Sequence, residues 1–222
     1  MYNIYNFYMP TRVVFGQNSL NELGNILDSY SERNFLIVTD QGIISAGILK
    51  KITNIFDSKG FGYQVFSEVE PNPKSATIKK GVDFATKNKI DFIIAVGGGS
   101  SIDTAKAIAV MLKNPGDILD YEGVGNIPNQ PVETIAIPTT AGTGSEVTAS
   151  TIITDESTLF KVAVISEKIF PTYAIVDPIL TLECPKSITS STGIDALTHA
   201  IESYLSKQNN GVVSEMALKA IK

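Results

Sequence analysis

The sequence predicts a doubly wound α/β domain on a mostly parallel sheet, followed by the start of an all-α second domain. Short β-branched segments alternate along the chain with longer amphipathic helical patterns, as in a sheet covered by helices. The segment Phe92–Val96 is apolar at every position, which is typical of a parallel strand buried on both faces. From Pro185 onward the pattern is helical to the last residue.

Six strands and four helices are expected in this Rossmann-like arrangement. The strands are expected at Arg12–Phe15, Asn34–Thr39, Gly62–Phe66, Asp91–Val96, Glu133–Ile137 and Tyr173–Val176. The helices are expected at Leu20–Tyr30, Ile43–Lys59, Ser75–Asn88 and Ile102–Leu112. The segment Thr151–Ile165 predicts a β-hairpin with the polar residues Asp155–Thr158 as its turn.

A change of composition after Asp177-Pro178 predicts a domain boundary near residue 180. Residues 1–180 are expected to form the α/β domain, and residues 181–222 to begin a helical domain. The last helix has no stop signal, because neither a glycine cap nor a following proline ends it. We therefore expect a truncated helical domain, with a frayed terminal helix as the alternative.

Composition and charge exclude several classes of partner. The net charge is −5 and no basic run interrupts the acidic balance, so a nucleic-acid partner is not expected. No stretch approaches the ~20 apolar residues of a membrane span, and the N-terminus lacks the pattern of a signal peptide. The single cysteine, Cys184, favours a reducing compartment and predicts a structural thiol. These observations predict a cytoplasmic protein.

A glycine-rich turn follows the most apolar strand. Gly97, Gly98, Gly99 and Ser100 lie where this strand is expected to turn into a helix. Glycines let a phosphate approach the backbone, and the helix N-terminus offers free N–H groups. The spacing fits neither common nucleotide fingerprint, so a structural turn is the alternative to a phosphate site. Asp103 is a candidate to help cap this helix.

Three further features are candidates for the site. Ser100 or Ser101 is expected to cap the helix after the glycines, and Lys106 either to face phosphates or to pair with Asp103. Asp40 ends its strand and either accepts hydrogen bonds from a ribose or caps the next helix.

Two more motifs lie further along the chain. The segment Pro138–Thr148 carries five hydroxyls and two glycines and either presents donors to a ligand or is an ordinary polar loop. Asp195 and His199 are four residues apart on a helix and point the same way, so they form either a surface hydrogen bond or two ligands of one metal ion. Oxygen and nitrogen donors together favour Fe²⁺ or Zn²⁺ over Ca²⁺ or Mg²⁺.

Three motifs taken together resemble the iron-containing (group III) alcohol dehydrogenase family. They are Gly97–Lys106, Pro138–Thr148 and Gly193–Tyr204, in that order along the chain. Pro71-Asn72-Pro73 and the strand end at Asp40 resemble the family too. The resemblance implies an N-terminal dinucleotide-binding domain, a C-terminal helical metal-binding domain and a cleft between them.

The resemblance also implies roles for particular residues. The cofactor-binding positions would be Asp40 at the adenosine ribose, Asn72, the turn Gly97, Gly98, Gly99 and Ser100, the acidic Asp103 after it, Thr139, Thr140, Thr143 and Ser145 in the second loop, and Lys161 near the nicotinamide ribose. Asp195 and His199 would be the first two metal ligands. The two further histidines of the family pattern do not occur, because His199 is the only histidine in the chain.

The function implied by the resemblance is reversible hydride transfer between NAD(H) and a small primary alcohol or its aldehyde. Fe²⁺, with Zn²⁺ as an alternative, would act as the Lewis acid, with an incomplete ligand set in this chain. A homodimer is the implied assembly, and Asp40 favours NAD over NADP. The alternatives are a nucleotide-binding fragment without turnover and a glycerol-type polyol dehydrogenase.

Overall fold

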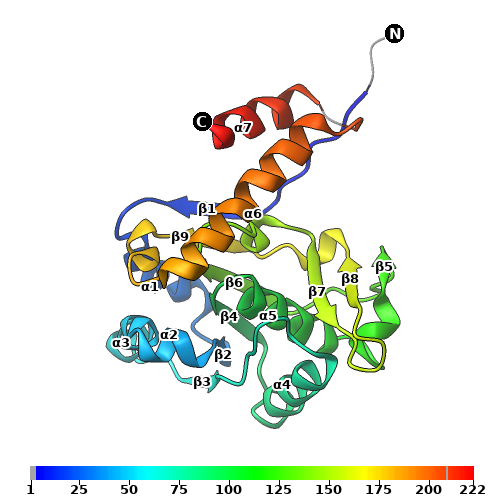
Figure 1. Ribbon diagram of the computed structural model, residues 1–222. Coiled ribbons are helices and arrows are strands. Elements are labelled where there is room, and N and C mark those ends of the chain that lie inside the picture. The colour runs from blue at the N-terminus through cyan, green and yellow to red at the C-terminus, as the bar shows by residue number, and fades with distance from the viewer. Residues whose placement is uncertain (1–3, 209) are drawn as a thin grey trace.

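A six-stranded sheet forms the centre of the molecule, in the order β1-β9-β6-β4-β2-β3 (Figure 1). The computed structural model describes residues 4–208 and 210–222. The strands are β1 (Arg12–Phe15), β2 (Phe35–Val38), β3 (Tyr63–Phe66), β4 (Phe92–Gly97), β6 (Glu133–Pro138) and β9 (Tyr173–Val176). Every neighbouring pair is parallel. The predicted fold class and its six strands are confirmed.

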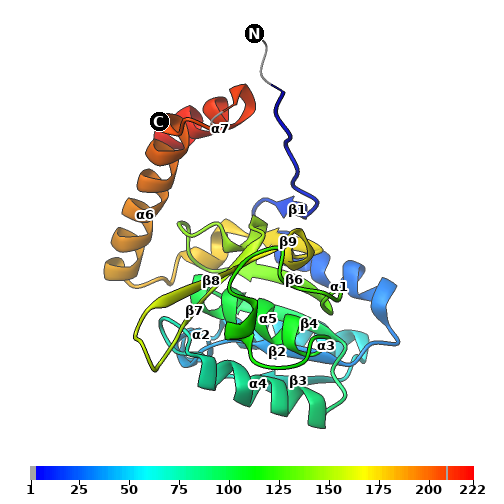
Figure 2. The ribbon, with the colours of Figure 1, turned by 90° about the vertical axis from the view of Figure 1, so that its right-hand side faces the viewer.

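Helices cover both faces of this sheet (Figure 2). They are α1 (Glu22–Leu27), α2 (Gln41–Ser45), α3 (Ile48–Lys59), α4 (Ser75–Lys87) and α5 (Gly99–Met111), with short 3₁₀ segments η1 (Ser19–Asn21), η2 (Asp28–Tyr30), η3 (Ile118–Tyr121), η4 (Ser145–Val147), η5 (Glu167–Ile169) and η6 (Pro178–Thr181). Alternate side chains of β4 point to opposite faces. Phe92 and Ile94 pack with α1 and α3, whereas Ile93 and Ala95 pack with α4 and α5. The all-apolar sequence of β4 is therefore explained by cover on both sides.

The strand order reverses between β2 and β4. From β2 the chain moves outward to β3, and it then returns to place β4 on the other side of β2. The loops that leave the carboxyl ends of β2 and β4 therefore turn away from each other. Open α/β sheets bind ligands at such a switch point.

Three predicted helices have different bounds in the structure. The expected helix Ile43–Lys59 is two helices, because Gly47 adopts a left-handed conformation (φ 72°) after α2. The expected helix Leu20–Tyr30 is α1 with a 3₁₀ turn at each end. The expected helix Ile102–Leu112 begins earlier, at Gly99. Glycines weaken a helical pattern, so sequence periodicity missed this first turn.

The predicted hairpin is confirmed and belongs to a second, smaller sheet. Its strands β7 (Ser150–Thr154) and β8 (Lys161–Ile165) are antiparallel. The short strand β5 (Gly123–Val124), which sequence reasoning missed, pairs in parallel with β8.

The chain ends in two helices that we call the helical arm, α6 (Lys186–Leu205) and α7 (Gly211–Ile221). The arm extends away from the layered α/β part (Figures 1 and 2). Its described residues include only two that are buried, Ala200 and Ala217. The first turns of α6 lie beside the carboxyl ends of the central strands.

Candidate cofactor site

A cavity of about 870 Å³ opens at the carboxyl ends of the central strands. Its wall contains residues within two positions of the carboxyl ends of β2, β4 and β6, namely Asp40, Gly98 and Thr139. On the other side, Ile188 and Thr192 of α6 line it. The cavity therefore lies at the switch point of the sheet and is bounded on one side by α6.

The structure brings about half of the predicted site residues into this wall. Those that line the cavity are Asp40, Gly98, Gly99, Ser100, Thr139, Thr140 and Thr143. Those that do not are Asn72, Gly97, Asp103, Ser145, Lys161, Asp195 and His199.

The glycines let the second loop pack closely against the turn. A Cβ on Gly99 would lie 2.8 Å from Cγ2 of Thr143, and a Cβ on Gly98 would lie 3.3 Å from Oγ1 of Thr140. Gly97 has φ 145°, and a Cβ there would lie 2.4 Å from Oγ of Ser101. The turn thus packs against the second loop, as the structural alternative requires, and its residues Gly98 and Gly99 also line the cavity.

The N-terminus of α5 faces the cavity through Gly99 and Ser100. The first N–H groups of an α-helix have no intrahelical partner, and the helix dipole favours an anion there. The N-cap residue is Gly98, and no side chain caps the helix. The expected cap by Ser100 or Ser101 is therefore wrong, because both serines lie inside the first turn.

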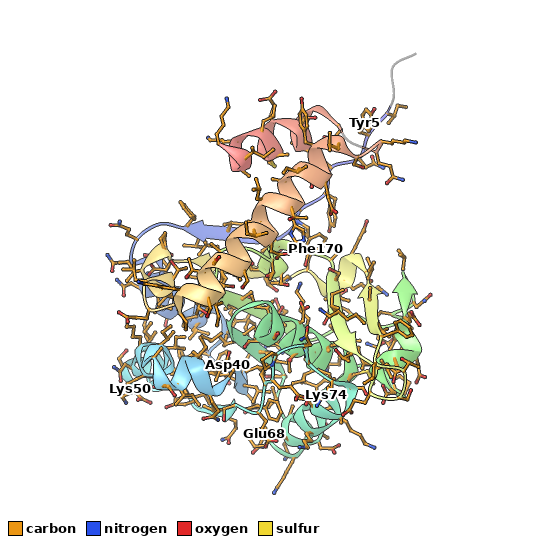
Figure 3. All side chains as sticks on the ribbon, viewed as in Figure 1. Tyr5, Asp40, Lys50, Glu68, Lys74 and Phe170 are labelled. Carbon is orange, nitrogen blue, oxygen red and sulfur yellow. The ribbon has the colours of Figure 1, made fainter. Side chains whose placement is uncertain are left out.

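Asp40 is the N-cap of α2 and also lines the cavity (Figure 3). Its Oδ1 accepts a hydrogen bond from the backbone N–H of Ile43 at 3.0 Å. Its Oδ2 accepts one from Oγ of Ser101 at 3.0 Å. The helix-cap alternative is thus what the structure shows, and each oxygen keeps a lone pair for a further donor.

Asn72 reaches the turn through its backbone. It has a left-handed conformation (φ 54°), and its N–H donates to Oγ of Ser100 at 3.3 Å. Its carbonyl accepts from Oγ1 of Thr154 on β7 at 3.4 Å. Asn72 therefore links the glycine turn to the hairpin. Lys161 lies on the hairpin as well, as the exposed first residue of β8.

Asp103 and Lys106 point away from the cavity and into the protein. Asp103 is 8% exposed, and Lys106 is 1% exposed. Burial raises the pKa of Asp103 to about 6 and lowers the pKa of Lys106 to about 8. Lys106 donates its hydrogen bonds to the second loop, so the alternative that it faces phosphates is wrong. The other alternative, an interaction with Asp103, agrees with the charge of Asp103 raising the pKa of Lys106.

Sequence reasoning missed the apolar part of the wall. Ile43, Val69 and Leu180 line the cavity and are buried. Val69 and Leu180 lie in the segments that follow β3 and β9. Their place just after predicted strands was a usable signal, since such segments meet at one edge of a parallel sheet.

Asp195 and His199 lie further along α6 on the face that lines the cavity. They follow Ile188 and Thr192 at three- and four-residue spacing, which places all four side chains on one stripe. Oδ1 of Asp195 and Nε2 of His199 are 3.7 Å apart, and both side chains are about half exposed. The pair therefore lies on the same stripe of α6 as two cavity-lining residues, but it does not line the cavity itself.

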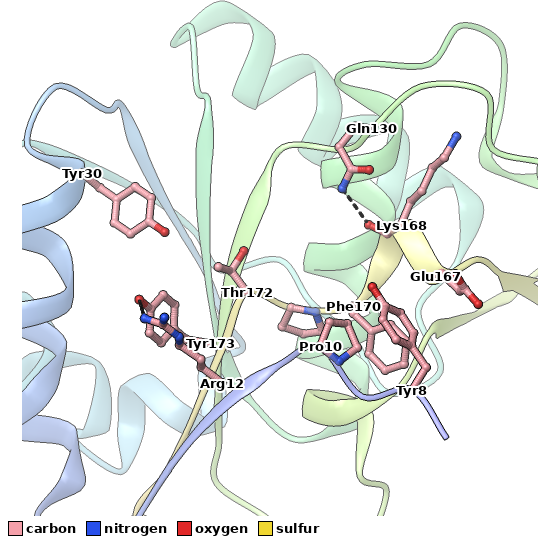
Figure 4. Close-up of a pocket in the computed structure, with 11 residues that line it drawn as sticks. Tyr8, Pro10, Arg12, Tyr30, Gln130, Glu167, Lys168, Phe170, Thr172 and Tyr173 are labelled. Carbon is pink, nitrogen blue, oxygen red and sulfur yellow. Dashed lines mark hydrogen bonds between the residues drawn. The ribbon is translucent and has the colours of Figure 1, made fainter. Parts of the chain in front are cut away.

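A second cavity, of about 590 Å³, lies near the amino ends of β1 and β9 (Figure 4). Tyr8, Arg12, Phe170 and Tyr173 are among its lining residues, and the Arg12 guanidinium lies 5.7 Å from the centre of the Tyr173 ring. None of the predicted site residues lines it. The candidate site is therefore the first cavity.

Fold and cavity together define the class of the protein as a doubly wound α/β protein with a cavity at the switch point, where such folds bind ligands. Family models narrow this class. Residues 10–178 match the model described as iron-containing alcohol dehydrogenase, and residues 189–222 match the C-terminal model of the Fe-containing alcohol dehydrogenase family. The chain belongs to the iron-containing alcohol dehydrogenase family.

Individual relatives agree with this assignment. An NAD-dependent methanol dehydrogenase of Bacillus methanolicus is 40% identical over 98% of this chain and 57% of its own length. The crystal structure of a 1,3-propanediol oxidoreductase superposes with a TM-score of 0.93 at 33% identity, over 98% of this chain and 57% of that one.

A sulfoacetaldehyde reductase from Bifidobacterium kashiwanohense, solved in complex with NAD⁺, has a TM-score of 0.91 at 32% identity, over 99% of this chain and 58% of its own. The chain thus spans less than three-fifths of the length of these relatives. No helix among residues 4–208 and 210–222 is long and apolar enough to cross a membrane.

Proposed function

We propose that this chain forms the NAD(H)-binding part of an alcohol dehydrogenase that transfers hydride reversibly between NAD(H) and a small primary alcohol or its aldehyde. One observation carries the proposal. The glycine turn, the threonine loop and Asp40 come from three different strand ends and meet in one cavity. The hydride chemistry belongs to the cofactor, so the role of these residues is to bind and orient it.

The wall of the cavity suits the parts of a dinucleotide. The free N–H groups at the start of α5 suit the pyrophosphate. Asp40 suits the adenosine ribose, where its charge disfavours the 2′-phosphate of NADP. The buried apolar side chains of Ile43, Val69 and Leu180 suit the adenine base. We therefore propose NAD rather than NADP as the cofactor.

The remaining assignments rest on the resemblance. We propose that Asn72 and Ser145 support the cofactor from the segments that border the cavity, and that Lys161 lies toward the nicotinamide ribose. Asp103 belongs to the same set, and its buried carboxylate supports a role through the second loop. Each of these four assignments remains a proposal.

A metal site is only partly represented. Asp195 and His199 supply one oxygen and one nitrogen donor, which suits Fe²⁺. The residues that the structure describes contain no group of three His, Cys, Asp or Glu side chains placed to hold a metal. Catalytic metals generally need three protein ligands, so this pair does not fit one by itself. We propose the pair as two ligands of Fe²⁺ and derive no chemical step through the metal.

The experiment is a binding and turnover assay on this chain. NADH binding is measured by fluorescence, and NAD⁺ reduction is followed with methanol, ethanol, 1,3-propanediol and glycerol, with and without added Fe²⁺. We expect saturable NADH binding. Any turnover with added Fe²⁺ is expected to favour primary alcohols over glycerol.

Other outcomes favour the other candidates. Saturable binding with no turnover would make the chain a nucleotide-binding fragment. Preference for glycerol would favour a polyol dehydrogenase. Absence of NADH binding would overturn the proposed function altogether.

Assembly and location complete the proposal. We propose a homodimer, supported by the edge strand β1, where Val13 is 44% and Phe15 is 74% exposed. Analytical ultracentrifugation tests it. We propose a cytoplasmic location, supported by a single cysteine in 222 residues.

A further inference from the structure

A buried lysine ties the second loop to the helix that carries the glycine turn. Lys106 lies on α5, and its Nζ donates to the carbonyl oxygen of Thr148 at 2.9 Å and to Oγ1 of the same residue at 3.1 Å. It also donates to the carbonyl oxygens of Ser150, at 3.0 Å, and of Ser145. Four acceptors in one short stretch of chain thus surround one ammonium group.

Asp103, one turn earlier on α5, binds the same stretch. Its Oδ1 accepts from Oγ of Ser145 at 3.1 Å, and its Oδ2 accepts from the backbone N–H of Ile152 at 3.2 Å. Its carbonyl oxygen accepts from Oγ1 of Thr151 at 2.8 Å. Two adjacent turns of α5 therefore fix residues 145–152.

These bonds determine where the cavity-lining threonines lie. The loop between β6 and η4 carries Thr139, Thr140 and Thr143, and it contains no helix or strand. At its start, the N–H of Thr139 donates to the carbonyl oxygen of Gly97 at 3.0 Å. At its end, Lys106 and Asp103 hold the residues from Ser145 onward. The loop is therefore anchored to the glycine turn and to α5.

These hydrogen bonds require Lys106 to be protonated. An ammonium has three N–H protons for the four acceptors, whereas a neutral amine has two. The charged groups that interact with the pair are Glu146 on η4, which raises the pKa of Lys106, and Lys161 on β8, which lowers that of Asp103. Burial outweighs both influences, because it is the largest cause of each shift.

We propose that Lys106 is a positioning residue for the cofactor, which acts by holding the second loop against the glycine turn, with Asp103 as its partner. The inference rests on the proposed function, since it requires that the cavity binds NAD(H). Neither side chain lines the cavity, so neither touches the cofactor directly. Both act through Thr140 and Thr143.

The proposal gives NADH affinity a particular pH dependence. As the pH rises through about 8, Lys106 loses its proton and one donor, so the loop loosens and the Kd rises. As the pH falls through about 6, Asp103 gains a proton. Its neutral carboxyl group holds Ser145 and Ile152 less strongly than the carboxylate does, so the loop loosens and the Kd rises. Affinity is therefore highest between these values. At one pH unit beyond either pKa, only about a tenth of the Lys106 or Asp103 side chains are charged. The Kd of NADH is then expected to rise by up to about tenfold.

The test is the Kd of NADH from pH 5.5 to 9 for the 222-residue chain and three variants. Lys106→Met removes the donors and keeps the chain length, and we expect a Kd at pH 7 about tenfold or more above that of the unaltered chain. Asp103→Asn removes the acid limb of the profile and keeps the alkaline one, moved to lower pH because the charge of Asp103 no longer raises the pKa of Lys106. Lys113→Met makes the same change at an exposed lysine just beyond α5 and keeps the full profile.

A purely structural role would lower the thermal midpoint and leave the shape of the pH profile unchanged. That result in Lys106→Met overturns the inference and leaves the proposed function intact. If Lys106→Met does not fold, the Asp103→Asn variant decides between the two roles. If its NADH affinity still falls at acid pH as that of the unaltered chain does, the inference is overturned. Absence of NADH binding by the unaltered chain overturns both the inference and the proposed function.

Discussion

The α/β layers and the helical arm bury their apolar residues to very different extents. In β4, Phe92 and Ile94 are fully buried, at 0% exposure. In the arm, Ile194 is 63% and Leu205 is 72% exposed. The first region is held by its own core, whereas the second leaves large apolar side chains exposed to solvent.

This difference in packing distinguishes the proposed cofactor site from the proposed metal ligands. The glycine turn and the threonine loop start from strands in the densely packed region, so their geometry is set by residues that this chain contains. Asp195 and His199 lie on an exposed helix face, with nothing among the described residues to fix their side chains against a third ligand. Cofactor binding is therefore expected to be independent of the metal pair.

The largest expected effect is a matched pair of isoleucine truncations. Ile94→Ala, in the core, is expected to lower the free energy of unfolding by about 3–4 kcal/mol, because it removes buried methyl groups and leaves a cavity. Ile194→Ala, on the arm, is expected to change it by less than about 0.5 kcal/mol. Urea unfolding measures both. Equal losses would mean that the arm is packed as tightly as the sheet.

A second pair compares one glycine from each region. Gly99→Ala places a Cβ 2.8 Å from the Thr143 side chain, so we expect the loop to move and the Kd of NADH to rise about tenfold. Gly193→Ala on α6 meets nothing within 4 Å and is expected to leave the Kd unchanged while stabilising the helix by up to ~1 kcal/mol. Fluorescence titration and thermal unfolding measure the two effects. An unchanged Kd in Gly99→Ala would show that the glycine does not position the loop.

A smaller effect is expected from Asp40→Asn. Asparagine caps helices about as well as aspartate, so the thermal midpoint is expected to stay the same. The lost charge removes repulsion of a 2′-phosphate, and we expect the NADPH Kd to fall by about five- to tenfold relative to that of NADH. An unchanged ratio of the two Kd values would refute the role given to Asp40.

Much of the fold was predictable because strands buried on both faces appear in the sequence as short runs of apolar residues. All six strands of the main sheet and the hairpin were found from apolar runs and turn residues. The helix bounds were less accurate where glycine decides them, at Gly47 and Gly99, because periodicity does not show which conformation a glycine adopts.

The site was predictable where a residue's role depends on its place after a strand, as for Asp40 and the glycine turn. It was not predictable for Lys106, whose four acceptors lie 39 to 44 residues further along the chain. A lysine one turn after a phosphate-type turn suggests a phosphate contact, and only the tertiary structure shows that it faces the second loop. The apolar wall was missed because Val69 and Leu180 lie in segments without a motif.

The central claim is the proposal that the residues of this chain are sufficient to bind NADH without a metal ion. Calorimetric titration of the 222-residue chain with NADH, with and without a strong chelator, tests it most directly. The account predicts saturable binding of one NADH per chain, with Kd values that agree within about twofold in the two conditions. No saturable binding, or binding that the chelator abolishes, would contradict it.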